Sequence, residues 1–236
     1  MASWTTRIGL IVPDVNVVVE PELSRALPSN VSMHVSRVRY DFGLEDPLGD
    51  LISDVPRCAR QLSKANVHGV ALACTGASFY RGCGSDLDIG ATIQSITGVP
   101  STTASTAVIN SLKRVSAKSI SLATPYDDWV NVREEKFIKD NGINVDSVAG
   151  LGIRDGGRIS EFNASDARRI ALQVDCRSAD VLFISCTNFE TFRIIRELQD
   201  EIGKPVLTSN LSTLWELLYM VGHPKGESYE QLLTLL

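Results

Sequence analysis

The chain has 236 residues, of which 44% are hydrophobic and 22% charged, as in globular proteins that bury a substantial core. The net charge is −5 and no cluster of Lys and Arg is present, so neither a nucleic acid nor a membrane surface is an expected partner. The opening MASWTT lacks the basic and apolar segments of a signal peptide, and the longest apolar runs are too short to span a bilayer. We therefore expect a cytoplasmic protein.

Apolar runs alternate with amphipathic helical patterns along the whole chain. Strands are predicted at 7–12, 31–39, 68–74, 118–123, 143–149, 180–186 and 205–208. Helices are predicted near 46–65, 85–97, 103–115, 127–141, 163–177, 190–202, 210–221 and 226–235. This alternation predicts an α/β fold with mainly parallel sheets. The runs at 68–74 and 180–186 are apolar at nearly every position, which is typical of strands covered by helices on both faces.

Two parts of the chain resemble each other, which indicates an internal duplication. The strand that ends at Pro13 is followed 61 positions later by Cys74, and the strand that ends at Pro125 is followed 61 positions later by Cys186 (74 − 13 and 186 − 125). In each part a Gly-x-Pro sequence comes next and leads a short strand into a helix. Each copy of the repeated unit therefore carries one thiol at an equivalent place.

The duplication predicts two α/β halves related by a pseudo-twofold axis. The first half is 1–115, which the segment 210–236 can complete, and the second half is 116–209. Ligands of parallel sheets bind beyond the carboxyl ends of the strands. We therefore expect the active site in the cleft between the halves, where the strand-end loops meet.

Cys74 and Cys186 are the main candidates for chemistry because each ends a strand and precedes a helix. The N–H groups at a helix N-terminus favour a thiolate, so we expect a lowered pKa for each thiol. A thiolate can abstract a proton or attack carbon, and an opposed thiol can return a proton. The alternative is that both cysteines only pack in the core. Packing is the interpretation for the other three cysteines, Cys58, Cys83 and Cys176, although Cys83 is a minor rival of Cys74.

Small polar residues near the thiols can hold a substrate carboxylate. Neutral donors of this kind stabilise the charge that builds on carboxylate oxygens. The candidates are Thr75, Gly76, Ser78, Thr187 and Asn188. Their alternative role is ordinary helix N-capping. Three further candidates for substrate binding are Asn16, Tyr126 and Asn163. Asn16 could instead be an ordinary loop residue, Tyr126 a packing residue and Asn163 a helix N-cap.

Several kinds of site have no support in the sequence. The three histidines are scattered, and no Cys/His spacing suggests zinc, so no metal is expected. The chain has neither G-x-G-x-x-G nor G-x-x-x-x-G-K-[ST], the nucleotide-binding motifs, and it has no G-x-S-x-G nucleophile elbow. We therefore expect chemistry that uses no cofactor.

Over nearly its whole length the sequence resembles the aspartate/glutamate/hydantoin racemase superfamily, and within it the maleate cis–trans isomerase and arylmalonate decarboxylase branch. The segment 8–22, which contains Asn16, is similar to the start of the isomerases, and Cys74 and Cys186 match their cysteine pair. Other segments are more similar to the decarboxylases, which have glycine in place of the first thiol; these are 77–82, 105–110 and 123–126. The presence of Cys74 argues against a pure decarboxylase.

The resemblance implies a role for several residues. Cys74 would attack an alkene carbon and Cys186 would supply the proton, so that rotation about the new single bond converts a cis diacid into the trans one. The substrate-binding side chains would be Asn16, Tyr126 and Asn163. Decarboxylation also requires an apolar pocket, which Val15, Val17 and Leu151 could help to line.

We therefore predict a cofactor-independent two-cysteine isomerase of a small carboxylate, with conversion of maleate to fumarate as the first choice. The alternatives are an amino-acid or hydantoin racemase, an arylmalonate-like decarboxylase and a carboxylate-binding protein without activity. The resemblance also implies a homo-oligomer.

Overall fold

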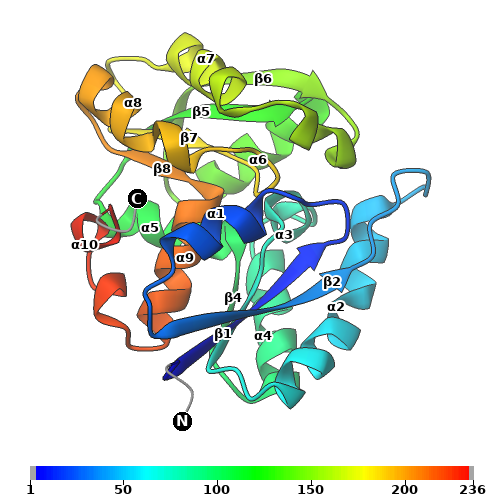
Figure 1. Ribbon diagram of the computed structural model, residues 1–236. Coiled ribbons are helices and arrows are strands. Elements are labelled where there is room, and N and C mark those ends of the chain that lie inside the picture. Colours follow the sequence, from blue (N-terminus) through cyan, green and yellow to red (C-terminus); the bar gives the residue numbers. More distant parts are fainter. Residues whose placement is uncertain (1–3, 234–236) are drawn as a thin grey trace.

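The computed structural model describes residues 4–233, which form two four-stranded sheets flanked by helices (Figure 1). The first sheet has the strand order β2-β1-β3-β4 and contains β1 (Thr6–Pro13), β2 (Val31–Val38), β3 (Gly69–Leu72) and β4 (Ser101–Thr103). The second has the order β6-β5-β7-β8 and contains β5 (Ser119–Tyr126), β6 (Asn144–Ile153), β7 (Val181–Ile184) and β8 (Val206–Thr208). All pairs of neighbouring strands are parallel.

The two sheets have the same topology, which confirms the predicted pair of related α/β halves. β1 and β5 occupy equivalent places, and each pairs with the strand that carries a thiol at its end, β3 or β7. Both of these inner strands are buried along their whole length, as their continuous apolar runs predict.

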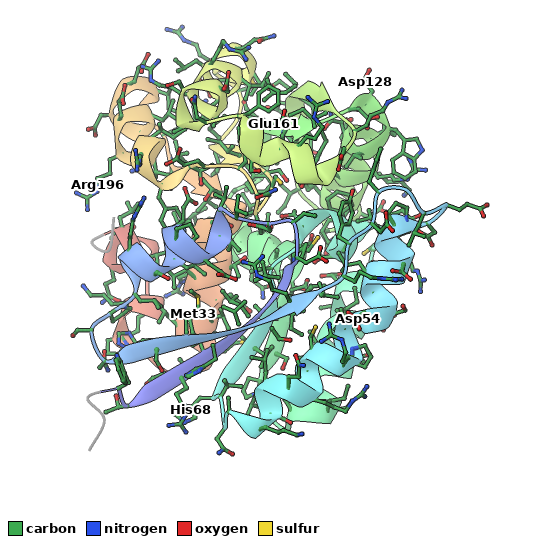
Figure 2. All side chains as sticks on the ribbon, turned by 45° about the vertical axis from the view of Figure 1, so that its right-hand side comes forward. Met33, Asp54, His68, Asp128, Glu161 and Arg196 are labelled. Carbon is green, nitrogen blue, oxygen red and sulfur yellow. The ribbon has the colours of Figure 1, made fainter. Side chains whose placement is uncertain are left out.

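The helices of the first half are α1 (Val19–Ala26), α2 (Pro47–Lys64), α3 (Thr75–Phe79), α4 (Ser85–Thr97) and α5 (Ala104–Arg114). The later α-helices are α6 (Asp128–Asp140), α7 (Ala164–Val174), α8 (Ile195–Ile202), α9 (Ser209–Met220) and α10 (Tyr229–Leu233). Three short 3₁₀ helices are η1 (Gly156–Glu161), η2 (Phe192–Ile194) and η3 (Pro224–Gly226). Exposed charged side chains such as Asp128, Glu161 and Arg196 lie on the outside of the molecule (Figure 2).

Most of the long predicted elements are present, and the differences have local causes. The helix at 85–97 has the predicted bounds, whereas the one predicted at 190–202 begins only at Ile195, after η2. β6 continues to Ile153, beyond the predicted end at 149. The prediction stopped early because Gly150 and Gly152, the latter with φ +77°, interrupt the apolar pattern at the end of the strand. The short elements α1, α3 and η1 were not predicted. The end of the helix predicted at 226–235 lies outside the described residues.

The largest hydrophobic core cluster spans both halves, and a second cluster lies within the first half, between its sheet and the helices α2 and α4. The largest cluster of buried residues includes Leu10 of β1, Leu122 of β5 and Leu214 of α9. The helices α5 and α9 pack against each other, and each also contacts the sheet of the other half: α9 contacts β3 and β4, and α5 contacts β8. The last helix of each half therefore crosses to its neighbour, which holds the strand ends of both sheets in a fixed relation.

The described residues show neither a membrane span nor a metal cluster. Between residues 4 and 233, no helix is both long and apolar enough to cross a bilayer. The same part of the chain contains no group of three or more His, Cys, Asp or Glu side chains placed to hold a metal ion.

Candidate active site

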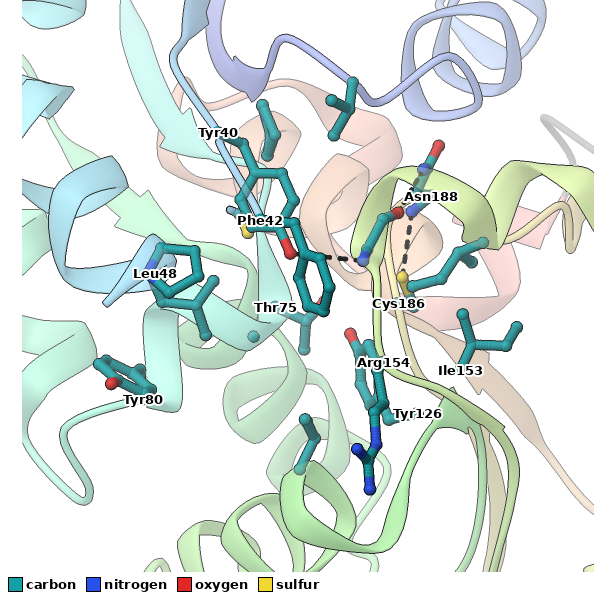
Figure 3. A pocket seen from close by; sticks show the side chains of 18 of the residues that line it. Tyr40, Phe42, Leu48, Thr75, Tyr80, Tyr126, Ile153, Arg154, Cys186 and Asn188 are labelled. Carbon is teal, nitrogen blue, oxygen red and sulfur yellow. Dashed lines mark hydrogen bonds between the residues drawn. The ribbon is translucent and has the colours of Figure 1, made fainter. Parts of the chain in front are cut away.

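The carboxyl ends of the strands of both sheets surround one cavity of about 570 Å³ (Figure 3). Cys74 and Cys186 both line it, one from each half. Six of the other predicted site residues also line it, namely Asn16, Thr75, Gly76, Tyr126, Thr187 and Asn188. The strand ends thus bring together residues that are up to 172 positions apart (16 to 188).

Each thiol is held in the neutral form by burial. Cys74 follows β3 and precedes the single turn of α3, and burial raises its pKa to about 11 although the Ala77 N–H favours the thiolate. Burial likewise raises the pKa of Cys186 to about 12, against the opposing effect of hydrogen bonds from the Tyr126 hydroxyl and the Asn188 N–H. The prediction that helix N-termini lower both pKa values is wrong, because removal from water outweighs the few N–H donors at each thiol.

Cys186 has a backbone conformation that is unusual for a residue with a side chain. Its φ is +91°, one of three positive values among the described non-glycine residues. The Asn188 N–H donates to its Sγ at 3.3 Å, and its own N–H donates to the Ser209 Oγ at 3.0 Å. Backbone strain of this kind persists where the surrounding structure enforces it and concentrates at functional sites. Here it directs the thiol toward the Tyr126 hydroxyl and the cavity.

Asn16 links the two halves at the edge of the cavity. Its side chain is 1% exposed and donates through Nδ2 to the Thr187 Oγ1 at 3.1 Å. The Thr187 hydroxyl in turn donates to the Ala73 carbonyl, next to the other thiol, at 2.9 Å. Asn188 adds a parallel link, because its Oδ1 accepts from the Val17 N–H at 3.1 Å. The loops after β1, β3 and β7 therefore position one another.

Ser209 connects the two thiol-bearing loops directly, and sequence reasoning missed it. Its Oγ is fully buried and accepts from the Cys186 N–H at 3.0 Å and from the Thr75 hydroxyl at 2.9 Å. It is the first residue of α9, the helix that crosses between the halves. The only sequence signal was its place after the second Gly-x-Pro unit, where the repeat leads a strand into a helix.

Glu22 of α1 is a second residue that the sequence did not reveal. It is 4% exposed and accepts from the backbone N–H groups of Thr191 and Phe192, at 2.5 and 2.8 Å, and from the Asn210 side chain at 2.7 Å. Burial raises its pKa in spite of these donors. Asn210 also donates to the Thr187 carbonyl at 3.2 Å, so this carboxyl group braces the loop that follows Cys186.

Two predicted site residues do not line the cavity. Asn163 is exposed and caps α7, where its side chain accepts from the Ser165 N–H at 2.8 Å within a capping box. Its alternative role as an N-cap is therefore what the structure shows. Ser78 is fully buried, and its hydroxyl donates to the Cys74 carbonyl at 2.6 Å.

The remaining cysteines lie away from the cavity lining. Cys58 is buried in the core, as predicted. Cys83 is exposed, so its interpretation as a packing residue is wrong. Cys176 is partly exposed, and the hydroxyls of three serines lower the pKa of its thiol to about 7; these are Ser121, Ser147 and Ser178.

The mouth of the cavity is apolar and aromatic. Its wall is formed by Phe42, Leu44, Leu48, Tyr80 and Trp129, and the rings of the last two lie 6.3 Å apart. Phe42 and Trp129 are about half exposed, at 48% and 50%. Of the three residues proposed for an apolar pocket only Val15 lines the cavity, whereas Val17 and Leu151 do not. At the rim, Arg154 forms an ion pair with Asp127 at 3.2 Å.

Two parallel sheets with a thiol at the end of each equivalent strand define a class of duplicated α/β enzymes with paired cysteines. The comparison of the sequence with protein-family models agrees with this class, since the arylmalonate decarboxylase model matches residues 8–233. The chain belongs to the arylmalonate decarboxylase family.

Individual relatives include both isomerases and a decarboxylase. The chain is 28% identical over 226 residues to a maleate isomerase of Geobacillus stearothermophilus, with 90% of each chain covered. It is 27% identical over 220 residues to an arylmalonate decarboxylase of Bordetella bronchiseptica, with 92% of this chain and 91% of the relative covered. The crystal structure of a maleate isomerase variant from Pseudomonas putida S16 with maleate matches the fold with a TM-score of 0.88, at 24% identity and over 97% of both chains. The chain is therefore an enzyme with the fold of this family.

Proposed function

We propose that the protein is a cofactor-independent cis–trans isomerase of a small unsaturated dicarboxylate, with maleate as the first substrate to test. The observation that carries the proposal is the presence of two thiols, Cys74 and Cys186, that line one cavity from the two different halves. The maleate isomerases among the relatives support the choice of substrate. A decarboxylase alone does not explain why both equivalent positions hold cysteine.

Because burial holds both thiols neutral in the empty site, Cys74 must first give its proton to solvent, after which the thiol pair holds one proton, on Cys186. The Cys74 Sγ forms a bond to one alkene carbon, and the displaced electron pair takes the Cys186 proton at the other carbon. The former double bond is now single and rotates. The Cys186 thiolate then removes the proton, the C–S bond breaks, and the trans diacid leaves. No electrons are gained or lost overall.

The polar residues of the cavity have a matching role. The carboxylate next to the carbon that receives the proton carries the developing negative charge. We propose that neutral polar residues lining the cavity stabilise this charge, and these are Asn16, Thr75, Tyr126, Thr187 and Asn188. Tyr126 contributes directly at the acid thiol, because its hydroxyl forms a hydrogen bond with the Cys186 Sγ.

A second candidate function is decarboxylation or racemisation of an acid that bears a bulky apolar group. The specific observation in its favour is the aromatic mouth of the cavity, since a four-carbon diacid fills only part of about 570 Å³. An aryl substituent would find its contacts on Phe42, Tyr80 and Trp129. The similarity to an arylmalonate decarboxylase supports this alternative.

Single replacement of each thiol distinguishes the candidates. For the isomerase we expect Cys74→Ala and Cys186→Ala each to lose roughly a thousandfold or more of the maleate-to-fumarate rate, measured by NMR, because each thiol has a separate role. Cys83→Ala, which removes an exposed thiol outside the cavity, serves as the control and should keep full activity.

Decarboxylation predicts a different pattern. Release of CO2 from an arylmalonate should then persist or increase in Cys74→Gly and disappear in Cys186→Ala. Full activity of both alanine variants would rule out a thiol mechanism, whereas no turnover of any of these substrates by the parent protein would leave a carboxylate-binding protein.

We further propose a cellular location and an oligomeric state for the protein. We expect it to be cytoplasmic, which fractionation of the source cells would check. We also expect a homo-oligomer, which light scattering coupled to gel filtration would check.

A further inference from the structure

A buried carboxyl group lies behind the acid thiol and has no part in the mechanism above. Glu134 of α6 is 2% exposed. Its Oε1 accepts from the Ser185 hydroxyl at 2.5 Å, and Ser185 immediately precedes Cys186. Its Oε2 is buried and has no hydrogen-bond partner. A carboxylate in such surroundings is costly, because burial without an ion pair disfavours charge.

The titratable groups that face Glu134 belong to the site itself. They are Cys186 in the loop after β7 and Tyr126 at the end of β5, and a negative charge on Glu134 raises the pKa of both. The neighbours on α6 point elsewhere: Arg133 lies over the Trp129 ring at 3.5 Å, and Glu135 pairs with Lys139 at the surface. Burial raises the pKa of Glu134 to about 8, so the group is mostly neutral at pH 7.

We propose that Glu134 is a positioning residue for the reaction, which holds the Cys186 end of the site neutral and opposes thiolate formation at Cys186 once it becomes charged. The two groups are linked through Ser185 and share one water-excluded region, where a pair of negative charges is strongly unfavourable. When Cys186 gives its proton to the substrate, a neutral Glu134 tolerates the new thiolate. Its role in turnover rests on the proposed function, whereas its effect on the thiol does not.

The experiment therefore measures the thiol without a substrate. Alkylation of Cys186 by iodoacetamide is followed by mass spectrometry of the peptide that contains it, between about pH 6 and 10, in a Cys74→Ser background that removes the second ionising thiol. In the parent protein the logarithm of the rate should rise with pH and bend near pH 8, where Glu134 becomes charged. In Glu134→Gln the side chain is neutral at every pH, so the logarithm of the alkylation rate should rise with pH without the bend.

The two proteins should therefore react equally fast at pH 6 to 7 and differ by about tenfold near pH 9.5, which corresponds to roughly one pKa unit. A change in packing alone would shift the rate equally at all pH values. Glu216→Gln is the matched control, because Glu216 is also a buried acid with an unpartnered Oε2 but is held by Asn110 between α5 and α9. Its profile should keep the bend.

A second variant keeps the test decisive if Glu134→Gln does not fold. Ser185→Ala removes the hydrogen bond that lowers the pKa of Glu134, so the bend should move to higher pH. Parallel profiles of Glu134→Gln and the parent, or an unmoved bend in Ser185→Ala, would overturn the inference. Neither result depends on whether maleate is the substrate.

Discussion

Burial makes both thiols unreactive in the empty site. The pKa values of about 11 and 12 for Cys74 and Cys186 mean that free thiolate is scarce at pH 7. This suits a site in which one thiol must keep its proton until the substrate needs it. It also protects the pair from oxidation, since the thiolate is the reactive form. The backbone at Cys186 adds a cost of its own, because a positive φ is unfavourable for any residue with a Cβ.

That cost should be measurable at Cys186. Glycine accepts φ +91° without strain, so Cys186→Gly should be more stable than Cys186→Ala by about 1 kcal/mol, measured by urea unfolding. At Cys74, where φ is −147°, glycine relieves nothing, and Cys74→Gly should be no more stable than Cys74→Ala. Equal stability of the two Cys186 variants would show that the backbone there is unstrained.

At the scale of elements, the strand-end loops are positioned by side chains from neighbouring strands. Arg37 near the end of β2 is the main example for the loop that carries Asn16. Its guanidinium donates to the carbonyls of Asp14 and Asn16 at 3.0 and 2.9 Å and pairs with Glu20 at 2.7 Å. The planar guanidinium of Arg37 thus holds the turn between β1 and α1 in place.

Loss of this clamp should affect substrate binding more than stability. In Arg37→Ala the loop of Asn16 is less ordered, so we expect KM to rise about tenfold with a smaller change in kcat. Arg39→Ala is the matched control, because Arg39 lies two residues further on and its guanidinium pairs with Asp50 at the surface. Steady-state kinetics of both variants on the active substrate would check this. An equal KM for the two variants would contradict the role of Arg37.

At the scale of the whole molecule, the largest core cluster belongs to both halves together, although a second cluster lies within the first half alone. The first sheet is covered in part by α9, which comes from the last quarter of the chain, and α5 reaches the second sheet. The residues of α9 from Ser209 to Leu218 are all buried. The division into 1–115, which 210–236 can complete, and 116–209 stays a prediction, and the contacts of α5 and α9 imply that two such units would depend on each other.

We accordingly expect the fragment 1–115 not to fold alone. Without α9, apolar surface of β3, β4 and α5 would face water, and small units with incomplete cores are marginal. Circular dichroism should show no cooperative thermal transition for this fragment. Its co-expression with 116–236 should restore a soluble complex with one transition. A cooperative transition of the fragment alone would show that α9 is dispensable.

The fold and the thiol pair were predictable because they leave local signals. Buried parallel strands such as 68–74 and 180–186 are apolar runs of a recognisable length, and the equal spacing from Pro13 to Cys74 and from Pro125 to Cys186 revealed the duplication. The cavity followed from a general property of parallel sheets. The short elements α1, α3 and η1 left no such signal, because a helix of one or two turns has too few periodic positions.

The supporting residues and the acidity of the site were decided by packing alone. Glu22, Glu134 and Ser209 contact partners that are 169, 51 and 23 positions away in sequence, at Thr191, Ser185 and Cys186. A single sequence contains no pattern that pairs such residues. The direction of each thiol pKa likewise depends on how completely the folded chain removes it from water, and that balance exists only after both halves have closed around the cavity.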